Sequence, residues 1–188
     1  FKGKEQRMSQ EEMEYAMEFI ENNFVFQDHQ AGSPFTIEGI LDFASSSLLR
    51  ANTSILVIDP FNFIDIKQGR QLLTEAINKM LTKTSQWAKQ TQSIVLFVAH
   101  PAKPQDRGQK VATGLDISGS ISWYTKADFL LSVSRNDYDT EVHVQKVRWN
   151  FQGTQGVAKL SYDLDSGRFV ELSEDIGFDK DYEWTTDF

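Results

Sequence analysis

Hydrophobic residues recur every three or four positions in three stretches of the chain, which predicts three amphipathic helices. The first begins with a capping box formed by Ser9 and Glu12 and ends near Asn22 and Asn23. The second begins at Thr36 and ends at the sequence ANTS, and the third spans about residues 68–90. Their apolar faces comprise Met13, Met17, Phe19 and Ile20; Ile37, Ile40, Leu41, Ala44, Leu48 and Leu49; and Leu72, Leu73, Ala76, Ile77, Met80, Leu81, Trp87 and Ala88.

Two further stretches are apolar without a helical period, and they predict buried strands. They are ILVI at residues 55–58 and SIVLFVAH at residues 93–100. Strands that are apolar on both faces and alternate with helices predict a parallel sheet covered by helices on each side. The fold class is therefore α/β. A short additional strand is predicted for FVFQD, residues 24–28.

Polar side chains follow both buried strands. Asp59 comes directly after the first, and His100 closes the second. Because the carboxyl ends of parallel strands meet at one edge, and open α/β sheets bind ligands outside that edge, we expect the two side chains to lie near each other.

The second half of the chain predicts a different arrangement. After a loop at 101–115 and a short helix at 116–127, alternating apolar patterns and turn residues predict strands at 128–135, 141–149, 157–163 and 167–172. The fold therefore ends in an antiparallel β-meander. Residues 173–188 are acidic and lack a period, and we expect them to form a flexible tail.

Composition narrows the possible functions. The 188 residues, 40% of them hydrophobic, suffice for one domain core, and the absence of cysteine excludes disulfides and thiolate metal sites. No apolar run approaches the roughly 18–20 residues of a membrane span. The net charge of −8 argues against broad attraction to nucleic acid, although HPAKPQDRGQK is locally basic through Lys103, Arg107 and Lys110.

Asp59 has two interpretations from these residues alone. It either starts a turn with Pro60 or acts as a Walker B acid, which binds Mg²⁺ largely through water. The phosphate-binding loop that accompanies a Walker B acid has the pattern G-x-x-x-x-G-K-[ST], and this sequence does not contain it.

His100 and the pair Lys146 and Arg148 also have a structural and a functional interpretation. The histidine is either structural or a sensor of a nucleotide phosphate. As a sensor, it would transmit the state of the nucleotide to the basic loop that follows it. The two cations alternate along QKVRWNFQGTQG and so share a strand face. They form either a solvated edge or an anion site, where the guanidinium of Arg148 presents a planar, permanently charged fork.

These elements together resemble a known family. Five motifs occur here in an order that resembles the RecA-like motor domain of hexameric replicative DNA helicases. They are a strand followed by Asp, a strand followed by His-Pro and a basic loop, SGSISWYTKADFLL, KVRWNFQGTQGV and LSYDLDSGRF. The similarity is greatest to the Twinkle type and the phage primase-helicases and more distant to the DnaB type. It runs from about Phe24 to Glu171.

The resemblance implies a role for each matching residue. Asp59 would hold Mg²⁺, His100 would sense the γ-phosphate, and Arg148, with Lys146 as its companion, would be an arginine finger acting on ATP or another NTP bound by a neighbouring subunit. Arg135 and Tyr162 would sandwich the base. Two loops would bind single-stranded DNA through Lys103, Arg107, Lys110, Ser118, Gly119 and Ser120.

The sequence also departs from the family pattern. The Walker A loop and the catalytic glutamate would precede Phe1, the connection after Arg148 is longer than in the phage enzymes, and SWYTKAD is less polar than expected, so that Lys126 is either a DNA contact or a surface residue. We expect residues 1–172 to be a partial, N-terminally truncated motor domain of a P-loop NTPase and residues 173–188 to be the tail.

The leading hypothesis is therefore the C-terminal portion of a ring-forming helicase, inactive alone, that moves on single-stranded DNA and unwinds duplex. The expected assembly is a hexamer, with a primase domain or primase partner, and the expected origin is bacterial or phage, in the cytoplasm and not at a membrane. One alternative is another RecA-like ATPase, a recombinase or recombination mediator. The other is a degenerate, non-catalytic interaction module.

Overall fold

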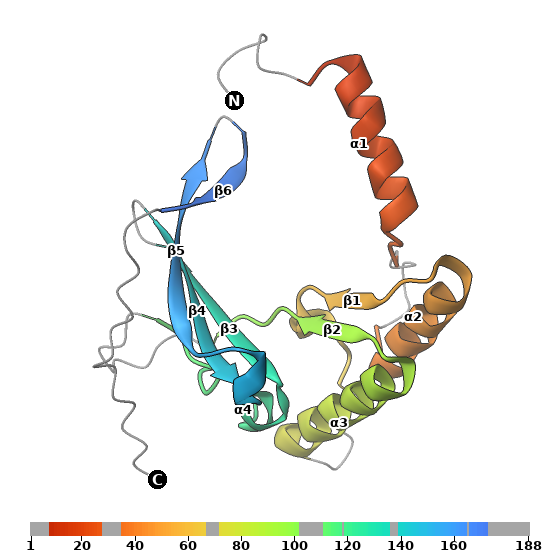
Figure 1. Ribbon diagram of the computed structural model, residues 1–188. Coiled ribbons are helices and arrows are strands. Elements are labelled where there is room, and N and C mark those ends of the chain that lie inside the picture. The colour runs from red at the N-terminus through yellow and green to blue at the C-terminus, as the bar shows by residue number, and fades with distance from the viewer. Residues whose placement is uncertain are drawn as a thin grey trace. The chain divides into compact units, whose positions relative to one another are not determined.

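The computed structural model (Figure 1) describes residues 8–27, 35–66, 72–101, 111–117, 119–135, 139–164 and 166–172. The chain divides into two compact units after Ala127. Neither Ser118 nor the predicted tail, 173–188, lies among the described residues.

The first unit alternates helices with parallel strands, as the hydrophobic pattern predicted. Its elements are α1 (Gln10–Asn23), α2 (Ile37–Ala51), β1 (Ile55–Ile58), the 3₁₀ helix η2 (Phe61–Phe63), α3 (Leu73–Thr91), β2 (Ile94–Phe97) and α4 (Ser122–Lys126). The third helix begins later than predicted, because Leu72 is extended. The helix expected over 116–127 is confined to five residues.

Side-chain caps fix the starts of the first two helices. The Glu12 N–H donates to Ser9 Oγ (3.2 Å) and the Ser9 N–H donates to Glu12 Oε2 (2.8 Å), which completes the predicted capping box. The bonds from the Ser9 N–H and hydroxyl lower the pKa of Glu12. The Gly39 N–H donates to Thr36 Oγ1 (3.2 Å) at the start of α2.

The strand predicted at 24–28 is wrong for the residues described. Phe24 ends α1, where its N–H donates to the Ile20 carbonyl (2.9 Å), and residues 24–27 are neither helix nor strand. The rings of Phe24 and Phe26 stack on each other at 6.1 Å between centroids. The alternating phenylalanines therefore pack locally rather than in a sheet.

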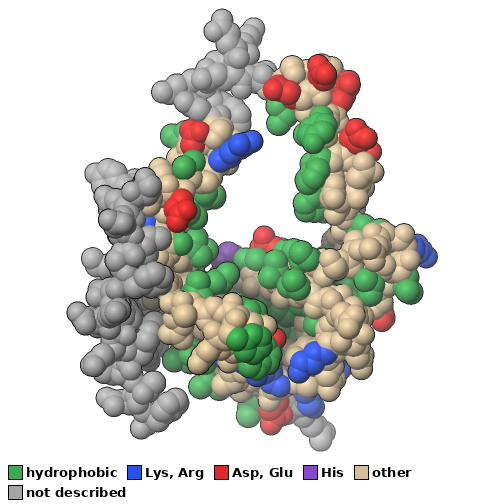
Figure 2. All heavy atoms as spheres, viewed as in Figure 1, with side chains coloured by type: hydrophobic (Ala, Val, Ile, Leu, Met, Phe, Trp, Pro, Cys, Tyr) green, Lys and Arg blue, Asp and Glu red, His purple; other side chains and the backbone are tan. Residues whose placement is uncertain are grey.

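α1 is amphipathic, but none of its residues is buried. Figure 2 shows hydrophobic side chains gathered along one side of this helix and acidic side chains along the other. Met13, Met17 and Ile20 keep 40% or more of their surface exposed. No helix in the described part of the chain is long and apolar enough to cross a membrane.

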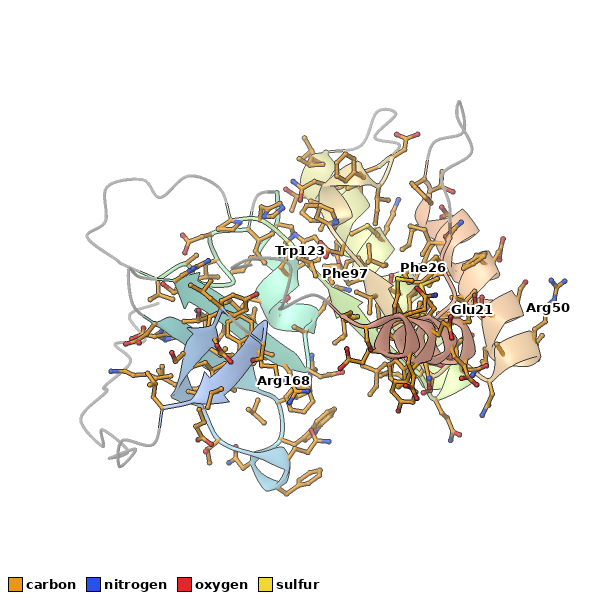
Figure 3. All side chains as sticks on the ribbon, turned by 90° about the horizontal axis from the view of Figure 1, so that it is seen from above. Glu21, Phe26, Arg50, Phe97, Trp123 and Arg168 are labelled. Carbon is orange, nitrogen blue, oxygen red and sulfur yellow. The ribbon has the colours of Figure 1, made fainter. Side chains whose placement is uncertain are left out.

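β1 and β2 pair in parallel, as predicted, and one face of the pair carries the core. Ile55 lies opposite Ile94 and Ile58 opposite Phe97. Ile58 packs with Ile77 of α3 and with Trp123 of α4, whose ring meets that of Phe97 at 5.5 Å between centroids (Figure 3). The helices α2 and α3 therefore cover this face (Figure 1).

The other face of the same strands is open among the described residues, so the predicted covering of both faces is not observed there. Ile55 and Val57 are 54% and 56% exposed, and Ile94 and Leu96 are 57% and 50% exposed. Parallel sheets bury both faces in stable folds. These apolar side chains therefore mark a surface that the described elements leave uncovered.

The second unit is the predicted antiparallel meander. Its strands are β3 (Phe129–Arg135), β4 (Thr140–Val147), β5 (Gly156–Asp163) and β6 (Arg168–Glu171), in the order β3-β4-β5-β6, and the 3₁₀ helix η3 (Asn150–Gln152) follows β4. The register shifts once: Leu130 is opposite Lys146, but Leu131 is opposite Val144. Gln145 is thus the extra residue of a β-bulge.

Candidate functional site

Asp59 and His100 follow the two parallel strands at the same edge. The ladder continues past both strand ends, because the Val98 N–H donates to the Ile58 carbonyl and the Phe61 N–H donates to the Val98 carbonyl, each at 2.9 Å. Both candidate side chains are exposed. The shared edge predicted from the sequence is confirmed, whereas the roles of the two residues stay predictions.

A lone carboxylate at this edge limits how a metal could bind. The residues that the structure describes contain no group of three or more His, Asp or Glu side chains able to hold a metal ion. Mg²⁺ is often bound by one or two carboxylates, with waters and substrate phosphates as the other ligands. An exposed Asp59 fits that mode, in which a nucleotide would supply the remaining oxygens.

In the second unit, the register at the β-bulge decides the face of the sheet on which Lys146 lies. Residues directly opposite each other share a face, so Lys146 lies on the face of its partner Leu130, which is 8% exposed. Burial, and then the charge of Arg148, lower the pKa of the Lys146 amine. Lys146 and Arg148 therefore form a positively charged pair, which is suited to an anionic group.

Arg148 is held by Asp128, a residue that the sequence did not single out. Its Nε donates to Asp128 Oδ1 at 2.7 Å, and its backbone N–H donates to the Asp128 carbonyl at 2.9 Å. The guanidinium carbon also lies 5.7 Å from the centre of the Trp149 ring. No sequence signal identifies Asp128, because it meets Arg148 only through the pairing of β3 with β4.

Arg135 and Tyr162 lie on one face at one end of the meander. Arg135 is opposite Thr140, and Thr140 is opposite Leu160, two residues before Tyr162. Since side chains alternate along a strand, these positions all share a face. Both residues are exposed, and the Tyr162 ring lies 5.0 Å from that of Phe169. An arginine and a phenol on one face suit the predicted base sandwich.

The predicted DNA-binding loops are only partly described. Lys103, Arg107, Lys110 and Ser118 lie outside the described residues. Ser120 is 9% exposed and its Oγ accepts the Ser122 N–H at 3.0 Å. Lys126 donates to the hydroxyl of Thr82 on α3, and its contact with DNA stays a prediction.

Gly119 is required by the packing of its loop. Its φ is +97°, and an added Cβ would lie 2.4 Å from Cδ1 of Ile77, the most deeply buried core residue at 1% exposure. Ser120 and Gly119 thus have local structural roles beside α3 and α4. Their contact with DNA stays a prediction.

We expect Gly119→Ala to lower the free energy of unfolding by about 1–3 kcal/mol, because the new methyl group overpacks Ile77 at a φ that favours glycine. Chemical denaturation of the purified protein measures the change. Gly153→Ala is the matched control, since Gly153 also has a positive φ (+149°) but nothing lies within 4 Å of its added Cβ. An equal loss in both variants would assign the effect to the backbone rather than to Ile77.

A groove of about 640 Å³ lies elsewhere in the first unit, beside α2 and α3. Its walls include Thr36, Glu38, Asp65, Lys79 and Lys83, and Lys83 donates to the Glu38 carboxylate across it. None of the residues predicted to bind nucleotide or DNA lines this groove. It is therefore separate from the edge that carries Asp59 and His100.

Comparison with solved structures identifies the class of protein to which this architecture is similar. The fold matches that of a DnaB-like replicative helicase, studied with its interactions with primase, at a TM-score of 0.68 and 16% identity, covering 92% of this chain and 44% of that one. No protein-family model matches the sequence.

The sequence itself is similar to the chloroplastic and mitochondrial Twinkle homolog of Arabidopsis thaliana, with 33% identity over an alignment of 174 residues that covers 88% of this chain. The resemblance to the motor domain of Twinkle-type and DnaB-type replicative helicases is thereby confirmed. The chain spans 24% of the length of that relative. Since the relative is organellar, a bacterial or phage origin and a cytoplasmic location stay predictions.

Proposed function

We propose that this chain is part of the RecA-like motor of a replicative DNA helicase that uses ATP or another NTP to move along single-stranded DNA and unwind duplex. The observation that carries the proposal is the parallel β1–β2 pair, which brings Asp59 and His100 to one edge in a chain related to Twinkle-type helicases. Ligands of open α/β sheets bind at that edge.

In this proposal Asp59 holds Mg²⁺ and His100 senses the γ-phosphate, while residues outside this sequence contribute the phosphate-binding loop and the catalytic glutamate. The apolar face of β1 and β2 that the described residues leave uncovered supports a larger core, because such a parallel pair needs further elements to cover it. Residues 1–172 would then be one part of that core, and this part alone would not hydrolyse nucleotide.

The position of Arg148 supports action on a neighbouring subunit. Arg135 and Arg148 lie at opposite ends of the β3–β4 pair: Arg135 is opposite Thr140, and eight positions separate Thr140 from Arg148. At about 3.4 Å per residue they are roughly 25 Å apart along the strand. One nucleotide would have to bridge most of this length to meet both, so we propose that each arginine serves a different nucleotide. Such an arrangement requires an oligomer, which we propose is a hexameric ring.

We propose that single-stranded DNA binds to the basic loop of residues 101–110. Contacts to the sugar-phosphate backbone are sequence-independent and are made by cations, as a motor on single-stranded DNA requires. The solved DnaB-like relative interacts with primase. We propose that the intact form of this protein also has a primase partner, either as a separate protein or as a fused domain.

Replacing Lys103 and Lys110 together by Ala in the intact protein should weaken binding to single-stranded DNA and make its salt dependence shallower, because fewer counterions are released. Fluorescence anisotropy with an oligodeoxythymidine at several salt concentrations measures both. Lys79→Ala with Lys83→Ala, on α3 beside the groove, controls for the loss of two charges. An unchanged salt slope would remove the loop lysines from the DNA path.

Strand displacement tests the function as a whole. The intact protein, given a forked duplex, Mg²⁺ and NTP, is expected to separate the strands, whereas residues 1–188 alone are expected to show no sustained hydrolysis. Strand exchange without displacement would identify a recombinase or recombination mediator instead. Nucleotide-independent DNA binding with no hydrolysis would identify a non-catalytic module.

A further inference from the structure

Asp128 and Arg148 meet at two points, where β3 begins and β4 has just ended. One contact joins backbone groups, the Arg148 N–H and the Asp128 carbonyl, and any residue at position 128 would provide it. The other joins the Asp128 carboxylate to Arg148 Nε at 2.7 Å. Only this second contact depends on the side chain at position 128.

Fold stability does not account for the carboxylate. The two side chains are 36% and 47% exposed, and ion pairs between exposed groups contribute little to the stability of a protein. The contact does restrict Arg148, whose long side chain loses conformational entropy when it is ordered. Its main physical effect is therefore to set the direction of the guanidinium.

The surroundings of Arg148 make such a restraint useful. Lys146 lies two residues before Arg148, and the two like charges repel each other, which is one cause of the lowered pKa of Lys146. Asp128 acts in the opposite direction on that pKa, so it partly offsets the repulsion. The Asp128 carboxylate therefore both contacts Arg148 and opposes the repulsion between the two cations.

We propose that Asp128 is a positioning residue for Arg148: through Nε, its carboxylate fixes the plane of the guanidinium that stabilises the phosphate charge of a nucleotide. This inference rests on the proposed role of Arg148. In metal sites, mutating a group that orients a metal ligand lowers metal affinity or activity about 10- to 100-fold. We expect a loss of activity of similar size here.

The test is Asp128→Asn in the intact protein, because this change keeps the backbone contact and the shape of the side chain and removes the charge. NTP hydrolysis on single-stranded DNA should show a kcat lowered about 10- to 100-fold with KM within about twofold. The melting temperature should be unchanged. Asp128→Glu should restore part of kcat, and Glu141→Gln, which disturbs the contact of Glu141 with His143 on β4, should leave it unchanged.

The double variant Asp128→Asn with Arg148→Ala separates this inference from the role of Arg148. If Asp128 acts through Arg148, the double variant is no slower than Arg148→Ala alone. If Asp128→Asn has a normal kcat while Arg148→Ala is inactive, the positioning role of Asp128 is wrong but the arginine-finger role of Arg148 is retained. A normal kcat for Arg148→Ala overturns the finger itself. A parallel fall in melting temperature and kcat, or additive losses, would assign Asp128 a role that is independent of Arg148.

Discussion

Replacing Arg148 by Lys in the intact protein is expected to lower the kcat of NTP hydrolysis by a factor of roughly 10³–10⁵, the range measured for arginine fingers. Lysine keeps the charge but lacks the planar fork, and it has no Nε–H to donate to the Asp128 carboxylate. Nucleotide binding should be retained. Hydrolysis under saturating DNA and binding of a fluorescent nucleotide measure the two quantities separately.

Mixed rings decide whether Arg148 acts across a subunit interface. An Arg148→Lys subunit has an intact Asp59, and an Asp59→Asn subunit has an intact Arg148. In a random equal mixture about a quarter of head-to-tail interfaces would combine both intact residues, so some hydrolysis should return. If both residues served the same nucleotide within one subunit, no mixture would recover activity. The mixture of each variant with itself is the control.

The elements that the sequence predicted correctly are those with a local cause. The capping box at Ser9, the helical period of α2 and α3 and the apolar runs of β1 and β2 are all carried by residues close in the chain. The shared edge of Asp59 and His100 followed from these, because a helix between two apolar strands implies parallel pairing.

The predictions that failed depend on whether another segment packs against the predicted element. Residues 24–27 alternate like a strand, but no strand in the described part of the chain pairs with them, and the rings of Phe24 and Phe26 pack on each other. The helix expected from residue 116 begins only at Ser122, because Gly119 lies against Ile77 in a conformation that a helix does not allow. Neither contact can be predicted from the periodicity of the sequence.

The candidate site was predictable to the same extent. Strand ends mark Asp59 and His100, and the alternation of the predicted strand at 141–149 marks Lys146 and Arg148. The bulge at Gln145 and the contact with Asp128 come from the register of β3 with β4, which side-chain pattern alone does not fix. Residues that orient others are therefore harder to predict than residues that end a strand.

Asp59→Asn should abolish metal-dependent hydrolysis in the intact protein, with kcat lowered on the order of a thousandfold or more, since metal stabilisation of phosphoryl charge is worth several kcal/mol. The amide is isosteric and the side chain is exposed, so the melting temperature should not change. Titration of Mg²⁺ against hydrolysis rate measures the effect.

Asp65→Asn is the matched control, because Asp65 is also exposed and follows η2 in the same segment but does not end a strand of the parallel pair. The two variants lose the same charge within six positions of each other, so a difference between them isolates the strand edge. Normal hydrolysis by the Asp59→Asn variant would contradict the metal-binding role and favour the interpretation that Asp59 only starts a turn with Pro60. Loss in Asp59→Asn alone, with Mg²⁺-free nucleotide binding retained, would place the metal at the carboxyl edge of β1 and β2.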